Sequence, residues 1–204
     1  RTSRSQYAPS VTRVPVLPLT SWPVMRSCTG SAMRASVIAV RTVWRRLQAF
    51  FSLPLFTGYS LPRDSKAGGA AAYWIPLLGL FTGARVGELC QLRVCDIEHG
   101  EDGAFLHITE EAEDARVKTE AGVRSVPLHS ELVRLGFLDY VAALKAAGKT
   151  SLWPAMRFRM VEGVAKPGAY FSDWFGEFRR KHAPTVPDFH SCPIAQGVRR
   201  FSVL

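Results

Sequence analysis

The charged side chain best placed to do chemistry in this sequence is an arginine that follows a Thr-Gly pair. Segment 80–92 reads Leu-Phe-Thr-Gly-Ala-Arg-Val-Gly-Glu-Leu-Cys-Gln-Leu, with Arg85 and Glu88 as its charged residues. Gly83 can end one helix, which predicts that Arg85 lies in the first turn of the next. A guanidinium group can bind two oxygens of a phosphate, but residues three apart on a helix also form ordinary surface ion pairs. Spacing alone leaves both interpretations open.

A lysine and an arginine flank a short turn in a second segment. Segment 117–128 reads Val-Lys-Thr-Glu-Ala-Gly-Val-Arg-Ser-Val-Pro-Leu, which predicts two strands joined by a turn over 119–121. A lysine beside a turn is usually a solvated residue, but an ammonium group can also donate a proton to a leaving oxygen. Lys118 is therefore a candidate general acid, and Arg124 is expected to contact backbone or neighbouring acids.

A histidine near the end of the sequence is the third candidate. Segment 188–194 reads Asp-Phe-His-Ser-Cys-Pro-Ile, and His190 could hold a phosphate oxygen. Cys192 and Arg199 suggest the phosphate-binding loop of a cysteine phosphatase. That loop needs Cys directly after His and five residues before Arg. Here Ser intervenes, six residues separate Cys192 from Arg199, and Pro193 removes a backbone donor, so this alternative is disfavoured.

In this order the three segments resemble motifs of the tyrosine recombinases, the phage-integrase family, and the resemblance covers residues 69–190. The family's first motif is Thr-Gly-x-Arg followed by Glu-Leu, its second is a mobile hairpin Lys-Thr…Arg-x-Val-Pro-Leu, and its third begins His-x-x-Arg. The resemblance implies that Arg85 binds the scissile phosphate, Lys118 protonates the leaving 5′-oxygen and His190 holds the phosphate. The implied DNA-binding residues are Arg85, Lys118 and Arg124, with Glu88 as structural support.

The sequence departs from the family pattern after His190. Pro193 stands where the family has its second arginine. In the family the nucleophilic tyrosine follows the histidine, whereas in this sequence no tyrosine follows His190. The resemblance implies site-specific DNA recombination or integration by metal-free phosphoryl transfer through a tyrosine. The departures imply that this chain is inactive, so its standing as an enzyme is open. The alternatives are a non-catalytic DNA-binding remnant and an unstable product without function.

Partners and location follow from the same resemblance. The implied partners are double-stranded DNA and other recombinase protomers in a synaptic complex; no cofactor, metal or membrane is expected. The implied location is the cytoplasm of a bacterium or phage host cell.

Four cysteines without a Cys-x-x-Cys pair predict free thiols in a reducing cytosol. The longest apolar run, over 70–81, is too short to cross a bilayer.

Helices around a small antiparallel sheet are expected to position these residues, which gives an α+β, mainly helical fold. The resemblance makes it a fragment of a tyrosine-recombinase catalytic domain. Hydrophobic periodicity predicts helices over 43–51, 70–81, 84–93, 129–147 and 170–182, with a loop over 52–69. Alternation and turn residues predict strands over 94–97, 104–109, 115–118 and 122–128.

The net positive charge comes entirely from the first third of the chain. Residues 1–66 contain ten lysines and arginines and one acid, whereas the remainder contains sixteen charges of each sign. The net charge of +9 therefore says nothing about what the remainder binds. We expect an irregular basic arm over 1–45, an integrase-like catalytic domain over 46–190 and an atypical tail over 191–204. A DNA-binding extension, a transit-like peptide and translation in the wrong frame are all open for the arm, and a frame change for the tail.

Overall fold

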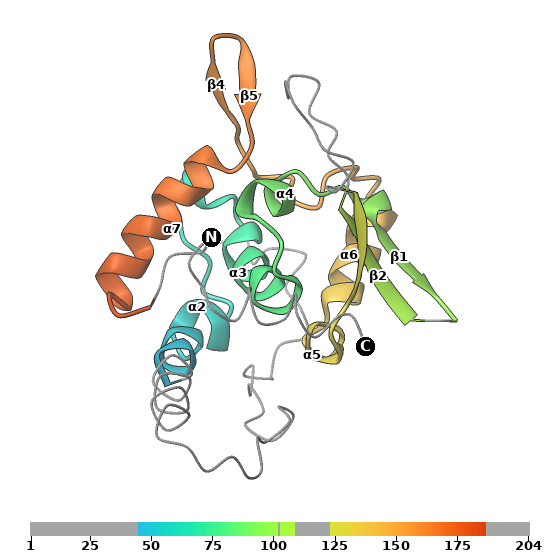
Figure 1. The fold of residues 1–204 in the computed structure, drawn as a ribbon, viewed down its shortest axis with the longest axis horizontal. Coiled ribbons are helices and arrows are strands. Elements are labelled where there is room, and N and C mark those ends of the chain that lie inside the picture. Colours follow the sequence, from blue (N-terminus) through green and yellow to red (C-terminus); the bar gives the residue numbers. More distant parts are fainter. Residues whose placement is uncertain (1–44, 102, 109–122, 187–204) are drawn as a thin grey trace, which may run out of the picture.

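The computed structural model describes residues 45–101, 103–108 and 123–186, and the fold is an α+β arrangement over these residues (Figure 1). The helical elements are residues 45–51, α2 (Pro54–Thr57), η1 (Ser65–Ala67), α3 (Ala71–Thr82), α4 (Val86–Cys90), η2 (Val94–Asp96), α5 (Ser130–Arg134), α6 (Phe137–Ala146) and α7 (Ala169–His182). The strands are β1 (Ile97–Gly100), β2 (Gly103–Ile108), β3 (Arg124–Pro127), β4 (Arg159–Val161) and β5 (Val164–Lys166).

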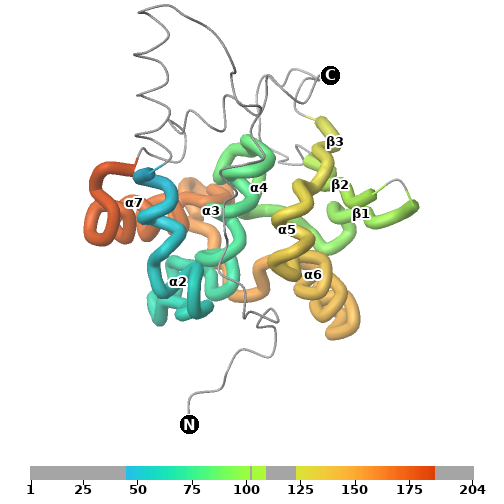
Figure 2. The backbone as a smooth tube through the Cα atoms, turned by 90° about the horizontal axis from the view of Figure 1, so that it is seen from below, coloured from blue at the N-terminus to red at the C-terminus, as the bar shows by residue number. Residues whose placement is uncertain are grey.

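Helix α3 lies at the centre of the described structure, because its sequence is apolar on every side. Nearly all its residues are buried, including Tyr73 and Trp74. A helix that is hydrophobic all round must be covered by other elements. Figures 1 and 2 show α2 and α7 on one side of α3, and the three-stranded sheet with α5 and α6 on the other. On that second side, the ring of Trp74 lies 5.1 Å from the ring of Phe137 at the start of α6.

The three-stranded sheet has the order β1-β2-β3, and both pairs are antiparallel. Its inner face carries Leu106 and Ile108, which are almost fully buried. Alternation along the strands puts His107 and Ser125 on the opposite face, directly across from each other in the register of β2 and β3. Arg124, opposite Ile108, therefore lies on the inner face.

A sharp break between α3 and α4 sets up the candidate site. Gly83 has a positive φ of 65° and ends α3, as the sequence predicts. The hydroxyl of Thr82 donates to the Leu78 carbonyl at 2.7 Å and accepts from the Ala84 N–H at 3.2 Å. The Thr-Gly pair thus satisfies backbone groups at the helix end and redirects the chain into α4.

Several sequence predictions are wrong in detail. The helix expected over 84–93 is limited to α4, and the strand expected over 94–97 is mostly the 3-10 helix η2. The helix expected over 129–147 is divided into α5 and α6, because Gly136 adopts a φ of 87° that interrupts helical geometry. The β4–β5 hairpin was not expected. The strand predicted over 115–118 and the regions 1–44 and 187–204 lie outside the described residues.

No helix among the described residues has the length and apolar character needed to cross a membrane.

Candidate functional site

Arg85 occupies the N-cap position directly before α4, whereas the sequence predicts it inside the first turn of a helix over 84–93. Its backbone is extended, with φ −72° and ψ 150°, and its side chain is exposed. Its N–H donates to Oε2 of Glu88 at 2.7 Å, so a carboxylate satisfies one of the free backbone donors at the helix start. Among the described residues, no carboxylate forms an ion pair with the Arg85 guanidinium group.

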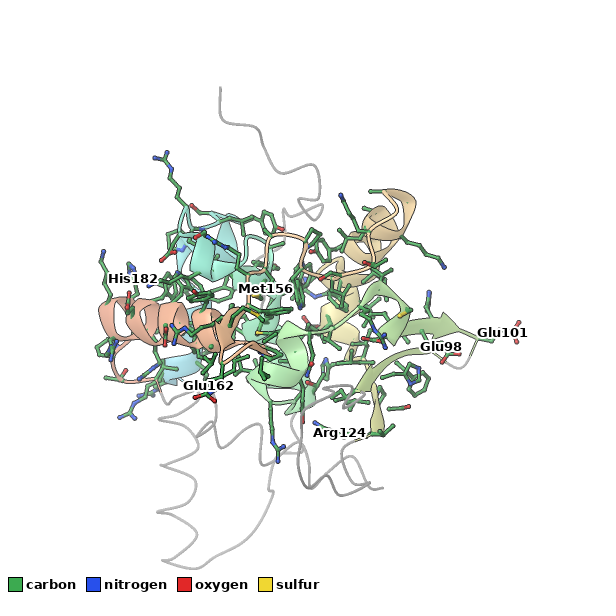
Figure 3. The ribbon with its side chains drawn as sticks, turned by 90° about the horizontal axis from the view of Figure 1, so that it is seen from above. Glu98, Glu101, Arg124, Met156, Glu162 and His182 are labelled. Atoms are coloured by element: carbon green, nitrogen blue, oxygen red, sulfur yellow. The ribbon has the colours of Figure 1, made fainter. Side chains whose placement is uncertain are left out.

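Glu88 joins this helix start to the sheet. Its side chain is 8% exposed, and its carboxylate accepts from Nη2 of Arg124 at 2.7 Å and from Nη1 at 3.4 Å. A buried carboxylate is costly unless it is paired and hydrogen-bonded, and Glu88 has an arginine and a backbone N–H. The pair spans 36 residues of sequence and fixes β3 beside α4. Figure 3 labels Arg124 on β3, where it approaches α4.

This arrangement separates the roles of the two arginines. Arg124 contacts an acidic side chain, which is one of the contacts expected for it, and that acid is Glu88. Since Glu88 is occupied by Arg124 and by the Arg85 N–H, the Arg85 guanidinium remains exposed to solvent. The structure therefore brings Arg85, Glu88 and Arg124 together. Lys118 and His190 lie outside the described residues.

The backbone behind Arg85 is held by close packing against the segment that precedes α7. Gly168 has a φ of 78°, and a Cβ atom there would lie 3.4 Å from the Cα of Gly87 and 3.3 Å from the Sγ of Cys90. On another side of α4, the indole Nε1 of Trp153 donates to the Leu89 carbonyl at 2.6 Å. The backbone that carries the exposed Arg85 is thus packed against buried residues.

The nucleophilic groups of one cysteine and three tyrosines are buried. Burial raises the pKa of the Cys90 thiol to about 12, so this cysteine is a protonated core residue near neutral pH. Burial also raises the pKa of Tyr73 to about 12 and that of Tyr59 further above its ordinary value. The hydroxyl of Tyr140 is buried and donates to the Leu152 carbonyl at 2.6 Å. Tyr73 and Tyr140 belong to the core, and the partly buried Tyr59 packs against it.

The structure also contains a trio of polar residues that sequence reasoning missed. On the outer face of the sheet, Nδ1 of His107 lies 2.8 Å from Oγ of Ser125, and Nε2 lies 2.8 Å from Oε2 of Glu98. An acid–His–Ser relay in a hydrolase works inside a site that excludes water. Here the Glu98 side chain is 69% exposed and that of His107 is 34% exposed. We therefore interpret the trio as hydrogen bonds that connect neighbouring strands, and not as a catalytic relay. Correct strand alternation over 97–108 and 124–127 would have placed all three on one face.

Residues 45–101, 103–108 and 123–186 contain no group of three or more His, Cys, Asp or Glu side chains that could hold a metal ion. Comparison with known proteins gives no match: no family model, no curated protein and no solved structure is similar to this chain at a significant level.

Proposed function

We propose that the chain is part of a tyrosine-recombinase catalytic domain, spanning about residues 46–190, and that it binds the phosphate backbone of double-stranded DNA through Arg85. The observation that carries this proposal is the set of contacts made by Glu88. This acid holds the backbone of Arg85 and the side chain of Arg124, and it leaves the Arg85 guanidinium exposed. In an ordinary helical ion pair, Glu88 would instead bind the Arg85 side chain.

An arginine held in this way suits a phosphate. Its planar guanidinium group can donate two parallel hydrogen bonds to phosphate oxygens. Because its backbone is fixed by Glu88 and by the contact between Gly87 and Gly168, less ordering is needed when DNA binds. Backbone N–H groups at the start of α4 add a favourable environment for an anion, although α4 is too short to form a site alone.

The family resemblance assigns the remaining chemistry to residues outside the described structure. Lys118 would donate a proton to the leaving 5′-oxygen, and His190 would hold the phosphate with Arg85. Glu88 and Arg124 position the site and do not touch the reacting atoms. Pro193, in place of the family's second arginine, supports binding of DNA without cleavage. The same departure favours a non-catalytic DNA-binding remnant as the second candidate function.

Fluorescence anisotropy with a labelled DNA duplex tests the proposal. We expect micromolar or weaker binding that falls steeply with salt, because phosphate contacts dominate. Arg85→Ala should weaken binding about tenfold at roughly 0.1 M salt and lower the slope of log affinity against log salt by about one. Lys149→Ala is the matched control, since it removes an exposed charge beyond the end of α6.

Equal effects of Arg85→Ala and Lys149→Ala would contradict a phosphate site at Arg85. A suicide DNA substrate tests for cleavage: no covalent adduct is expected, and an adduct would contradict binding without cleavage. Circular dichroism confirms that each variant is folded.

A further inference from the structure

The β4–β5 hairpin projects from the body of the described structure, as Figure 1 shows at the top of the molecule. Val161 pairs with Val164, so Glu162 and Gly163 alone form the turn, with φ values of 53° and 81°. Positive φ at both positions is typical of the tight turn that matches the twist of a two-stranded ribbon. Strands of three residues extend about 10 Å, which is roughly the rise of three base pairs of DNA.

The base of the hairpin is anchored on α7. The Arg159 guanidinium donates to Oδ2 of Asp173 and lies 4.8 Å from the centre of the Tyr170 ring. The hydrogen bond to Asp173 raises the pKa of Arg159. The register places Lys166 directly opposite Arg159, so the other strand is fixed at the same level. The hairpin therefore has a defined direction relative to α7.

The same base is fixed beside Arg85. After Lys166 the chain passes through Pro167 to Gly168, which packs against Gly87, two residues beyond Arg85. Figure 1 places α4 between the base of the hairpin and the three-stranded sheet, and Figure 3 labels Glu162 and Arg124 on the two sides. A long ligand bound at Arg85 and extended away from the sheet would therefore pass the hairpin.

The hairpin carries apolar and basic side chains, and alternation with the register places Met160 on one face and Arg159 and Lys166 on the other. Met160 is 61% exposed, Phe158 41% and Val164 37%, and these are three of the five exposed large hydrophobic residues among those described. Two exposed cations, Arg157 and Lys166, lie at the base of the strands. The two strands and their turn contain one acidic residue, Glu162 at the tip, which is also exposed. A surface of this kind fits a polyanion that also offers apolar edges.

We infer that the β4–β5 hairpin is a second DNA-contacting element, in which Met160 on one face enters a groove and Arg157 and Lys166 at the base of the strands bind phosphates. This inference rests on the proposed function of Arg85. A two-stranded ribbon fits the major groove of DNA, where apolar side chains contact thymine methyl groups. Duplex DNA is favoured over a protein partner because the hairpin begins beside the exposed Arg85 and carries its cations at that end. Glu162 repels phosphate, so it marks the end of the contact.

The test is a double variant, Arg157→Ala with Lys166→Ala, measured by anisotropy on a DNA duplex over a range of salt concentrations. We expect the salt slope to fall by about two and the affinity to drop by an order of magnitude or more at about 0.1 M salt. The control, Lys145→Ala with Lys149→Ala, removes the same charge at the end of α6 and should change the slope by less. Glu162→Gln should tighten binding, and Met160→Ser should weaken it with an unchanged salt slope.

Four outcomes separate the hairpin from the site at Arg85. If wild-type protein does not bind DNA, both proposals fail. If Arg85→Ala weakens binding but the hairpin and control variants behave alike, the hairpin inference alone is overturned. If the hairpin variants weaken binding and Arg85→Ala does not, the hairpin contact stands and the assignment of Arg85 fails. If Met160→Ser changes the molar mass in light scattering and leaves DNA affinity unchanged, the hairpin binds protein and the inference is overturned.

Discussion

Glu88 and Arg124 are 36 residues apart in the sequence, yet Oε2 of one lies 2.7 Å from Nη2 of the other. This pair joins the start of α4 to β3, the strand that directly follows residues 109–122. Because Glu88 also accepts from the Arg85 N–H, one carboxylate connects the phosphate-binding candidate to the sheet. The stability of the site should therefore depend on Glu88 more than on either arginine.

Glu88→Gln should lower the free energy of unfolding by about 2–4 kcal/mol, because it leaves the Arg124 charge without its buried partner. Urea denaturation provides the measurement. Glu98→Gln is the control, since the Glu98–His107 pair is exposed and should contribute less than about 1 kcal/mol. A double variant of Glu88 and Arg124 should lose less than the sum of the two single variants. Additive losses would show that the pair does not couple α4 to β3.

Gly168→Ala should destabilise the protein by about 1–3 kcal/mol, through a positive φ and through crowding. The added Cβ would lie 3.4 Å from the Gly87 Cα and 3.3 Å from the Cys90 Sγ. Gly163→Ala is a close control, because its φ of 81° is similar and nothing lies within 4 Å of the added Cβ. The difference between the two variants in thermal denaturation measures the crowding alone. Equal melting temperatures would contradict the tight contact behind Arg85.

Glu162→Asn should stabilise the protein by about 0.5–1 kcal/mol, since Asn tolerates positive φ better than Glu. Glu162 has a φ of 53° and is exposed at the hairpin turn. Thermal denaturation in parallel with Glu177→Asn, a change at an exposed position within α7, separates turn geometry from loss of charge. The helix variant should be neutral or slightly destabilised. Stabilisation of both variants would point to charge instead of backbone conformation.

Cys90 should resist alkylation in the native protein, whereas Cys95 should react readily. Burial raises the pKa of Cys90 from an ordinary value of 9.0 to about 12, and Cys95 is exposed. Since the native state keeps the Cys90 proton longer than the unfolded state, this group makes folding less favourable as pH rises above about 9. Mass spectrometry after iodoacetamide treatment at pH 8, with and without urea, identifies each labelled cysteine. Equal native labelling would contradict the buried environment of Cys90.

The sequence predicts those elements whose local signals agree with their packing. The apolar run over 70–81, ended by Gly83, becomes α3, and the aromatic residues of 170–182 become the inner face of α7. The interruption at Gly136 was missed because the hydrophobic spacing continues through it on both sides. The β4–β5 hairpin was missed because its strands have three residues each and its turn contains Glu at a positive φ.

Of the contacts in the candidate site, the sequence predicts only those between residues that are close together in the chain. The short-range hydrogen bond from the Arg85 N–H to Glu88 follows from a spacing of three residues at a helix start. The ion pair between Glu88 and Arg124 depends on how β3 packs beside α4, and no local pattern encodes that distance. The same holds for the contact between Gly87 and Gly168. Sequence therefore identifies the side chains with suitable chemistry, and packing decides which of them remains exposed.

The chain alone should form no covalent complex with DNA. Tyr59, Tyr73 and Tyr140 have buried hydroxyls that cannot reach a phosphate, and Tyr7 lies outside the described residues. Tyr170 lies under the Arg159 guanidinium on α7, a contact that holds the hairpin base. Under the proposed function, Pro193 stands where the recombinases have a second arginine, and the loss of that phosphate-binding group would by itself cost about 100-fold or more in rate. A nicked suicide substrate, analysed on a denaturing gel, traps any phosphotyrosyl adduct. An adduct that disappears on changing one tyrosine to Phe would contradict this prediction and relocate the active site to that residue.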